Sequence, residues 1–166
     1  MLKNFKNGYA VSDKSETARN ERNDCVVRAI ANACGVNYEQ AHELVKTKFA
    51  RKKGEGTLAF NMTMKTLGSV TFDQAGQLDM FADTSVKTFR HLGDMPKAGG
   101  KLMNTSYHHK KVAYTVKAFA QRYRRGNYIV LVNKHALAIN DGVIIDNSDY
   151  QTKGYRRVVE SAFAVA

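Results

Sequence analysis

Three short apolar runs lie close together in the last third of the chain. They are YIVLV (128–132), HALAI (135–139) and VIIDN (143–147). Runs of this length that are rich in branched side chains are typical of β-strands. Asp141 and Gly142 stand between the last two runs, and Asp-Gly in that position is a strong β-hairpin signal. The sequence therefore predicts an antiparallel sheet in the C-terminal part of the chain.

Helical patterns dominate the N-terminal half instead. Apolar residues recur at helical spacing from Cys25 to Cys34, and Gly35 then ends the helix. Asn37 followed by Gln40 is typical of a capped helix start. Other expected segments are an irregular arm (1–22), a basic loop (51–57), helices over 58–67, near 84–91 and after Thr115, and strands near 70–72 and 157–159. Helices first and an antiparallel sheet after them indicate an α+β fold, with residues 1–166 in a single domain.

Cys25 stands at the expected start of a helix. Unpaired N–H groups and the positive end of the helix dipole stabilise a thiolate there, and the same N–H groups can bind an oxyanion. The alternative interpretation is a buried structural cysteine, which is our expectation for Cys34. The two thiols lie about 13 Å apart along one helix, beyond disulfide reach, so both are expected to be free.

A thiol nucleophile needs a base, and His135 is the best placed of the five histidines because it opens a strand. A two- or four-residue hairpin loop centred on Asp141 and Gly142 places Asp146 diagonally beside His135 on one face of the sheet. A three-residue loop would place Asn147 there instead. We favour Asp146 as the residue that orients His135 and keep Asn147 as the alternative.

These motifs carry a resemblance. NDCVVRA at a helix start, then the KHALAI strand and VIIDN, look like the papain-like cysteine peptidases, in which Cys, His and Asp or Asn follow in this order. The NDC start is similar to the Asp-Cys opening of bacteriocin-processing and ubiquitin-like-protein peptidases. The whole chain also resembles small uncharacterised phage and prophage proteins that share the NDCVVRAIA block.

The resemblance implies a papain-like fold, with N-terminal helices packed on a C-terminal antiparallel sheet. It also implies a thiol protease or related hydrolase acting on peptide, isopeptide or amide bonds of a protein or peptide substrate. The family usually has a Gln six residues before the nucleophile to complete the oxyanion hole. Arg19 stands there in this chain, so Asn20 and Asn23 are the candidates to supply the amide.

A net charge of +11 favours acidic partners such as nucleic acid or an acidic protein. The alternative function is therefore an inactive papain-like scaffold that binds such a partner through its basic surface. The candidate binding residues are Arg51, Lys52, Lys53, Arg122, Arg124, Arg125, Arg156 and Arg157.

Other classes are not indicated by the sequence. No apolar run is long enough to cross a bilayer, and the first residues lack the apolar core of a signal peptide. A cytoplasmic location, the host cytoplasm for a phage protein, is the expectation, with no membrane partner. No metal is expected because His108 and His109 have no further ligand at suitable spacing, and no cofactor is expected.

Overall fold

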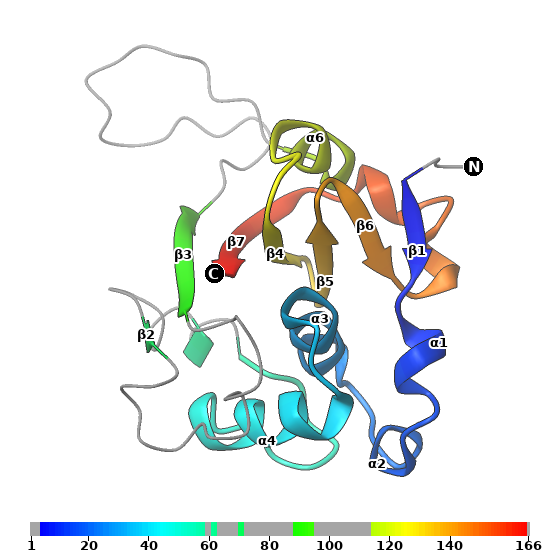
Figure 1. The fold of residues 1–166 in the computed structure, drawn as a ribbon, viewed down its shortest axis with the longest axis vertical. Coiled ribbons are helices and arrows are strands. Elements are labelled where there is room, and N and C mark those ends of the chain that lie inside the picture. The colour runs from blue at the N-terminus through cyan, green and yellow to red at the C-terminus, as the bar shows by residue number, and fades with distance from the viewer. Residues whose placement is uncertain (1–3, 59–60, 63–69, 72–87, 95–113, 166) are drawn as a thin grey trace.

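The computed structural model describes residues 4–58, 61–62, 70–71, 88–94 and 114–165. Within these ranges the chain has a mixed α+β fold built on a seven-stranded sheet, in the order β1-β6-β5-β4-β7-β3-β2 (Figure 1). The strands are β1 (Phe5–Asn7), β2 (Val70–Thr71), β3 (Thr88–Asp94), β4 (Asn127–Val132), β5 (His135–Asn140), β6 (Val143–Asp146) and β7 (Val159–Val165). Neighbours are antiparallel except for β1 and β6, which run parallel.

The predicted hairpin forms between β5 and β6. Asp141 and Gly142 both have positive φ values, 47° and 76°, as a tight two-residue hairpin turn requires. Asn140 pairs with Val143 across the turn. This is the register expected for the two-residue loop, and it fixes which side chains of the two strands share a face of the sheet.

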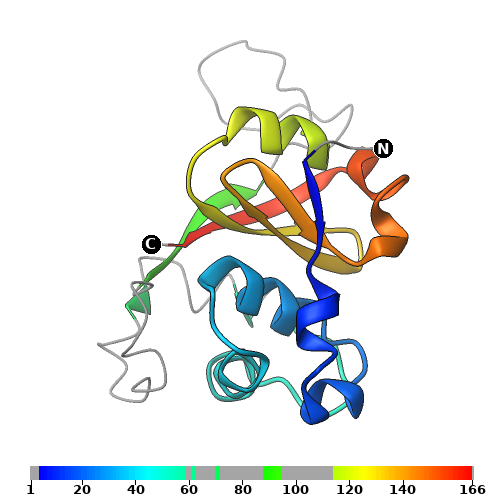
Figure 2. The same cartoon turned by 45° about the vertical axis from the view of Figure 1, so that its right-hand side comes forward.

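Helices cover both faces of the central strands, as Figure 2 shows. Helices α3 (Cys25–Cys34) and α4 (Tyr38–Lys48) lie on one side, and α6 (Val116–Arg122) lies on the other. In β4, Ile129 and Leu131 pack in the core with α3 and α4, whereas the alternate residues Val130 and Val132 pack with α6. The strands are apolar on both faces for this reason, which explains their uninterrupted apolar runs. The expected packing of N-terminal helices on the sheet is confirmed for α3 and α4, but the cover provided by α6 was not anticipated.

Local signals fixed the helix ends. Gly35 ends α3 in the left-handed region, at φ 67°. Asn37 and Gln40 form the predicted capping box of α4, and the Thr115 side chain accepts a hydrogen bond from the backbone N–H of Ala118 at the start of α6.

The first residues do not form the expected irregular arm. They form β1 and two short helices, α1 (Tyr9–Ser12) and α2 (Glu16–Arg19). Asn7 pairs with Asp146 in the parallel β1–β6 ladder, and the Gly8 N–H donates to the Asp146 carbonyl at 3.0 Å. A Cβ atom on Gly8 would lie 2.5 Å from Cγ2 of Ile145, so only glycine permits this close approach. The order of the arm comes from a strand more than a hundred residues away, which local patterns do not reveal.

The prediction of a helix near 84–91 is wrong for residues 88–91. Residues 88–94 form β3, which pairs antiparallel with β7, while 84–87 lie outside the described residues. Pairing with β7 overrides the local helical preference. The strand expected near 70–72 is present as β2, and the strand expected near 157–159 begins at Val159 as β7. Of the helix expected over 58–67, only 58 and 61–62 are described.

Three ionisable side chains join the loop after α4 to the segment before α3. Arg51 donates to Oε2 of Glu21 at 2.8 Å, and Nε2 of His42 lies 3.0 Å from Oε1 of the same carboxylate. The Glu21 and Arg51 side chains are only 3% and 1% exposed. Burial opposes ionisation of Glu21, but its hydrogen bonds with Arg51, His42 and the Gly54 N–H outweigh that effect and lower its pKa to about 2. Arg51 is thus a buried structural residue, and its assignment to a binding surface is wrong.

The depressed pKa of Glu21 predicts a loss of stability in acid. The unfolded chain takes up the Glu21 proton first as the pH falls, so the network stabilises the fold above about pH 4.5 and loses that contribution toward pH 2. We expect Glu21→Gln to be about 2 kcal/mol less stable at pH 7 and to lose less stability than the wild type between pH 4.5 and 2. Urea unfolding at a series of pH values measures both effects.

Glu55→Gln is the matched control, because Glu55 is an exposed glutamate in the loop after α4, which also holds Arg51. It should retain the wild-type acid dependence. An equal acid slope in Glu21→Gln and the wild type would contradict the role given to the network.

Candidate functional site

Cys25 is the first residue of α3 and is partly exposed. Asp24 precedes it, but its side chain makes no capping hydrogen bond. The Asp24 carboxylate instead accepts from Nε of Arg28 at 2.9 Å and from the hydroxyl of Tyr38 at 2.7 Å. Asp24 therefore stands at the N-cap position without capping the helix through its side chain. It leaves the backbone N–H groups of the first turn of α3, which begins at Cys25, without a side-chain cap.

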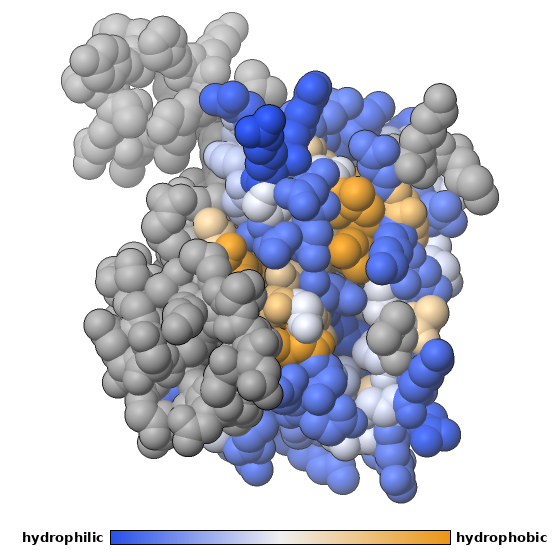
Figure 3. Space-filling model, in the orientation of Figure 1, coloured by the Kyte–Doolittle hydropathy of each residue, from blue (hydrophilic) through white to orange (hydrophobic). Residues whose placement is uncertain are grey.

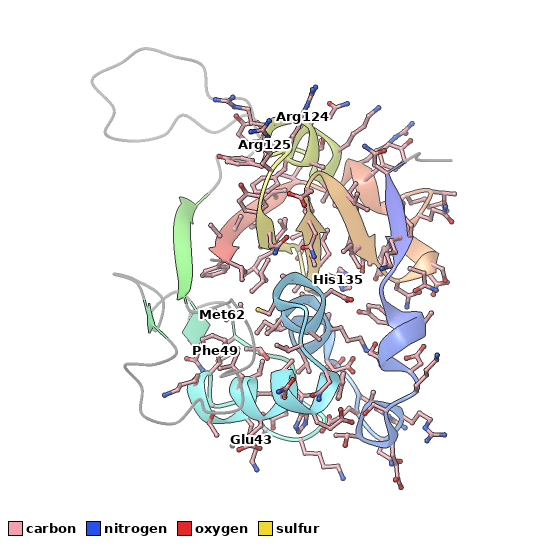
Figure 4. All side chains as sticks on the ribbon, in the orientation of Figure 1. Glu43, Phe49, Met62, Arg124, Arg125 and His135 are labelled. Atoms are coloured by element: carbon pink, nitrogen blue, oxygen red, sulfur yellow. The ribbon has the colours of Figure 1, made fainter. Side chains whose placement is uncertain are left out.

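His135 and Asp146 meet where β5 begins and β6 ends (Figure 4 labels His135). Nε2 of His135 lies 2.8 Å from Oδ1 of Asp146. This is the diagonal contact predicted from the hairpin. Asp146 is 1% exposed, and its Oδ1 also accepts from the Asn147 N–H at 2.8 Å. Hydrogen bonds from both sides hold the carboxylate in place.

Cys25 is the other hydrogen-bond partner of His135. Since Nε2 is engaged by Asp146, Nδ1 is the ring nitrogen left for the thiol. Burial alone would lower the pKa of His135, but the hydrogen bonds to Asp146 and Cys25 and the charges of both groups raise it to about 9. The positive charge of a protonated His135 therefore lies beside the Cys25 thiol. The arrangement thus places a thiol, an imidazole and a carboxylate in one row, the groups that nucleophilic catalysis by a thiol needs.

Arg157 and Tyr150 complete the surroundings of this row, and sequence patterns did not find them. Arg157 donates to Oδ2 of Asp146 at 2.7 Å. Its guanidinium also lies 4.1 Å from the centre of the Tyr150 ring, and that ring lies 4.7 Å from the His135 ring. Arg157 therefore contacts Asp146 and Tyr150 through its guanidinium, which is not the fully exposed cation expected of a surface that binds nucleic acid or an acidic partner. No local pattern distinguishes it from Arg156, because only the folded chain brings it to Asp146.

Tyr9 in α1 is a further neighbour that the sequence did not indicate. The Arg28 guanidinium lies 4.3 Å from the centre of its ring. Burial, followed by the charges of Asp146, Cys25 and Asp24, raises the pKa of the Tyr9 phenol well above its usual value. The phenol stays protonated, so the β1–α1 segment brings a neutral hydroxyl close to the charged groups of the site.

The three asparagines proposed as oxyanion or orienting residues are engaged elsewhere. Asn23 donates its amide to the Gly54 carbonyl, and Asn20 donates to the Glu16 carbonyl, both at 3.0 Å. The Asn147 side chain accepts from the Asp149 N–H, so it caps the 3₁₀ helix η2 (Ser148–Tyr150) instead of contacting His135. The two-residue turn decides against Asn147 as the orienting residue, and neither Asn20 nor Asn23 takes the place of the missing glutamine.

The other candidate binding residues are exposed. Lys52 and Lys53 lie in the loop after α4, and Arg156 lies in the 3₁₀ helix η3 (Gly154–Arg156). Arg122, Arg124 and Arg125 lie together at the end of α6, where hydrophilic side chains cover the surface (Figures 3 and 4). The neighbouring Tyr123 packs on Phe119 with ring centres 4.3 Å apart. The Tyr123 ring is partly buried and packs against the core, so one face of it is covered.

No protein-family model, curated protein or solved structure matches the chain. Among the described residues, no helix is long and apolar enough to span a membrane. The same part of the chain contains no group of three or more His, Cys, Asp or Glu side chains arranged to hold a metal ion.

The geometry of the site predicts unequal reactivity of the two thiols. Burial raises the pKa of Cys34 far above its usual value, whereas Cys25 is partly exposed beside His135. We expect iodoacetamide at pH 7 to label Cys25 at least ten times faster than Cys34, roughly as their different thiolate contents require. Peptide mapping after timed quenching measures both rates in one sample.

His135→Gln should slow the labelling of Cys25 and leave that of Cys34 unchanged. Equal, slow labelling of both thiols in the wild type would show that Cys25 is not an activated thiolate.

Proposed function

We propose that this protein is a cysteine hydrolase of papain-like architecture that cleaves peptide, isopeptide or amide bonds. The observation that carries the proposal is the row formed by Cys25, His135 and Asp146, with Cys25 at a helix start and the other two on adjacent strands. A helix bearing the thiol, packed against an antiparallel sheet bearing the imidazole and the carboxylate, supports the papain-like assignment.

In the proposed reaction the Cys25 thiolate attacks the substrate carbonyl carbon and forms a C–S bond. The first-turn N–H groups of α3 stabilise the negative charge on the carbonyl oxygen. His135 passes its proton to the nitrogen of the leaving amine as the C–N bond breaks, which leaves a thioester on Cys25. His135 then takes a proton from water, the hydroxide attacks the thioester, and the released thiolate regains its imidazolium partner. Asp146 orients His135 throughout.

The proposal is tested with a set of fluorogenic peptide amides that vary the residue before the cleaved bond. We expect Cys25→Ala to abolish release of the fluorophore. Asp146→Asn should lower kcat/KM by about 10²- to 10⁴-fold, because the orientation and the charge support of His135 are both lost. Thermal unfolding of each variant checks that the fold is retained.

Asp149→Asn is the matched control, since it makes the same chemical change at an exposed site in η2. It should keep kcat/KM within about twofold of the wild type, the size expected of surface changes away from the site. Asn147→Ala should also cost little. Hydrolysis that survives Cys25→Ala, or that depends on Asn147 more than on Asp146, would contradict the proposed triad.

A second candidate function is electrostatic binding of nucleic acid, favoured by the grouping of Arg122, Arg124 and Arg125 at one end of α6. Because the Tyr123 ring is partly buried against Phe119, the exposed arginines make contact with phosphates the main mode that this surface supports.

The test compares two triple substitutions that remove the same charge. Replacing Arg122, Arg124 and Arg125 by Gln should weaken binding to a single-stranded oligonucleotide. It should also reduce the slope of log K against log salt by about 2. Replacing Lys52, Lys53 and Arg156 by Gln removes equal charge from separate places and should cost less. Equal losses in both variants would indicate an effect of net charge and exclude the α6 surface as a specific site. Fluorescence anisotropy at several salt concentrations provides the measurement.

A further inference from the structure

Both carboxylate oxygens of Asp146 are occupied by different partners. Oδ1 faces Nε2 of His135 at 2.8 Å, and Oδ2 accepts from Arg157 at 2.7 Å. A carboxylate that only needed to orient a histidine would require the first contact alone. The negative charge of Asp146 is therefore divided between two cationic side chains inside the protein.

Arg157 is held in place by more than this ion pair. Its Nε donates to the Gly154 carbonyl at 3.1 Å, and its backbone carbonyl accepts from the Val116 N–H at 2.9 Å. The guanidinium also packs over Tyr150. A Cβ atom on Gly154 would lie 2.6 Å from Cβ of Tyr150, so the chain closes tightly around the arginine. Such support limits the positions that the guanidinium can adopt and directs it at Asp146.

We propose that Arg157 is a positioning residue of the site, which acts through Asp146 to set how strongly the carboxylate holds the proton of His135. By engaging Oδ2, Arg157 fixes Oδ1 toward the imidazole, and its positive charge offsets part of the negative charge that His135 experiences. The proton of His135 is thereby held less tightly than Asp146 alone would hold it, and its transfer to a leaving group is easier.

The other groups that face His135 and Asp146 do not supply this effect. Cys25 and Asp146 both favour the protonated imidazole, and the Tyr150 ring contacting His135 is a phenol, which cannot supply a positive charge. Tyr9 interacts with Asp146 and Cys25 as a neutral phenol. Among the described residues, Arg157 is the cation other than His135 itself that is in direct contact with the Asp146 carboxylate. The effect on catalysis rests on the proposed hydrolase function, whereas the effect on the charge state of His135 can be measured without a substrate.

The experiment follows the ring carbon signal of His135 by NMR as the pH is raised. It uses a Cys25→Ser background, so that the thiol does not titrate together with the imidazole. We expect Arg157→Gln to raise the titration midpoint of His135 by about one pH unit, because the positive charge paired with Asp146 is removed from the neighbourhood of the imidazole. In Arg157→Lys the midpoint should lie close to the value measured with arginine, because lysine restores the positive charge.

Arg156→Gln is the matched control. It removes the same charge from the adjacent, exposed residue, which lies over Tyr155 and not over Tyr150. Its midpoint should equal that of the Cys25→Ser background. If the Arg157→Gln variant does not fold, Arg157→Met replaces it in the comparison of His135 midpoints, because methionine keeps an apolar side chain packed on Tyr150.

A midpoint that is unchanged or lower in folded Arg157→Gln or Arg157→Met would overturn the proposal, as would an equal shift in Arg156→Gln. A merely structural arginine would lower the unfolding temperature without moving the midpoint. If the shift is found but no amide or ester is hydrolysed by the protein with Cys25 intact, the inference on Arg157 stands and the hydrolase proposal fails.

Discussion

The buried carboxylate of Asp146 is the constraint around which the other parts of the site are arranged. An ionised carboxylate that is 1% exposed is stable only when its oxygens are paired. His135, Arg157 and the Asn147 N–H provide that pairing. The partners come from the preceding strand, from the following residue and from the segment before β7, so three separate parts of the chain must be in place at once.

The need to pair the carboxylate oxygens of Asp146 also explains why the register between β5 and β6 matters. A slip by one residue between β5 and β6 would move Asp146 to the other face of the sheet, away from His135. The turn at Asp141 and Gly142 prevents that slip, because both residues adopt positive φ values that few other residue pairs accept. The backbone conformation of this turn thus determines whether His135 and Asp146 meet.

The parts of this structure that could be predicted from sequence are those fixed by local chemistry. The ends of α3 and α4 follow from Gly35 and from the Asn37–Gln40 capping box, and the contact between His135 and Asp146 follows from the turn. These signals operate within a few residues, so a single sequence contains them in full.

The remaining parts depend on contacts between distant segments. Arg51 and Arg157 have the same composition around them as ordinary surface arginines, yet Glu21 draws Arg51 into a buried ion pair and Asp146 draws Arg157 into a partly buried one. Residues 88–91 carry a helical pattern, and pairing with β7 makes them a strand. In each case no turn or cap signal links the residue to its deciding partner, so periodicity and composition do not reveal the contact.

The parallel strand β1 has a further consequence for the behaviour of the chain in solution. β1 occupies the outer edge of β6, whose Val143, Ile144 and Ile145 form an apolar strand. If the first residues detached, the unpaired N–H and C=O groups of that strand would become a template for another chain. A second molecule could then insert its own β1 there, giving an exchanged dimer, or add an unrelated strand and begin aggregation. Docking of the N-terminal segment therefore protects the molecule from association at the same edge that carries the Asp146 carboxylate.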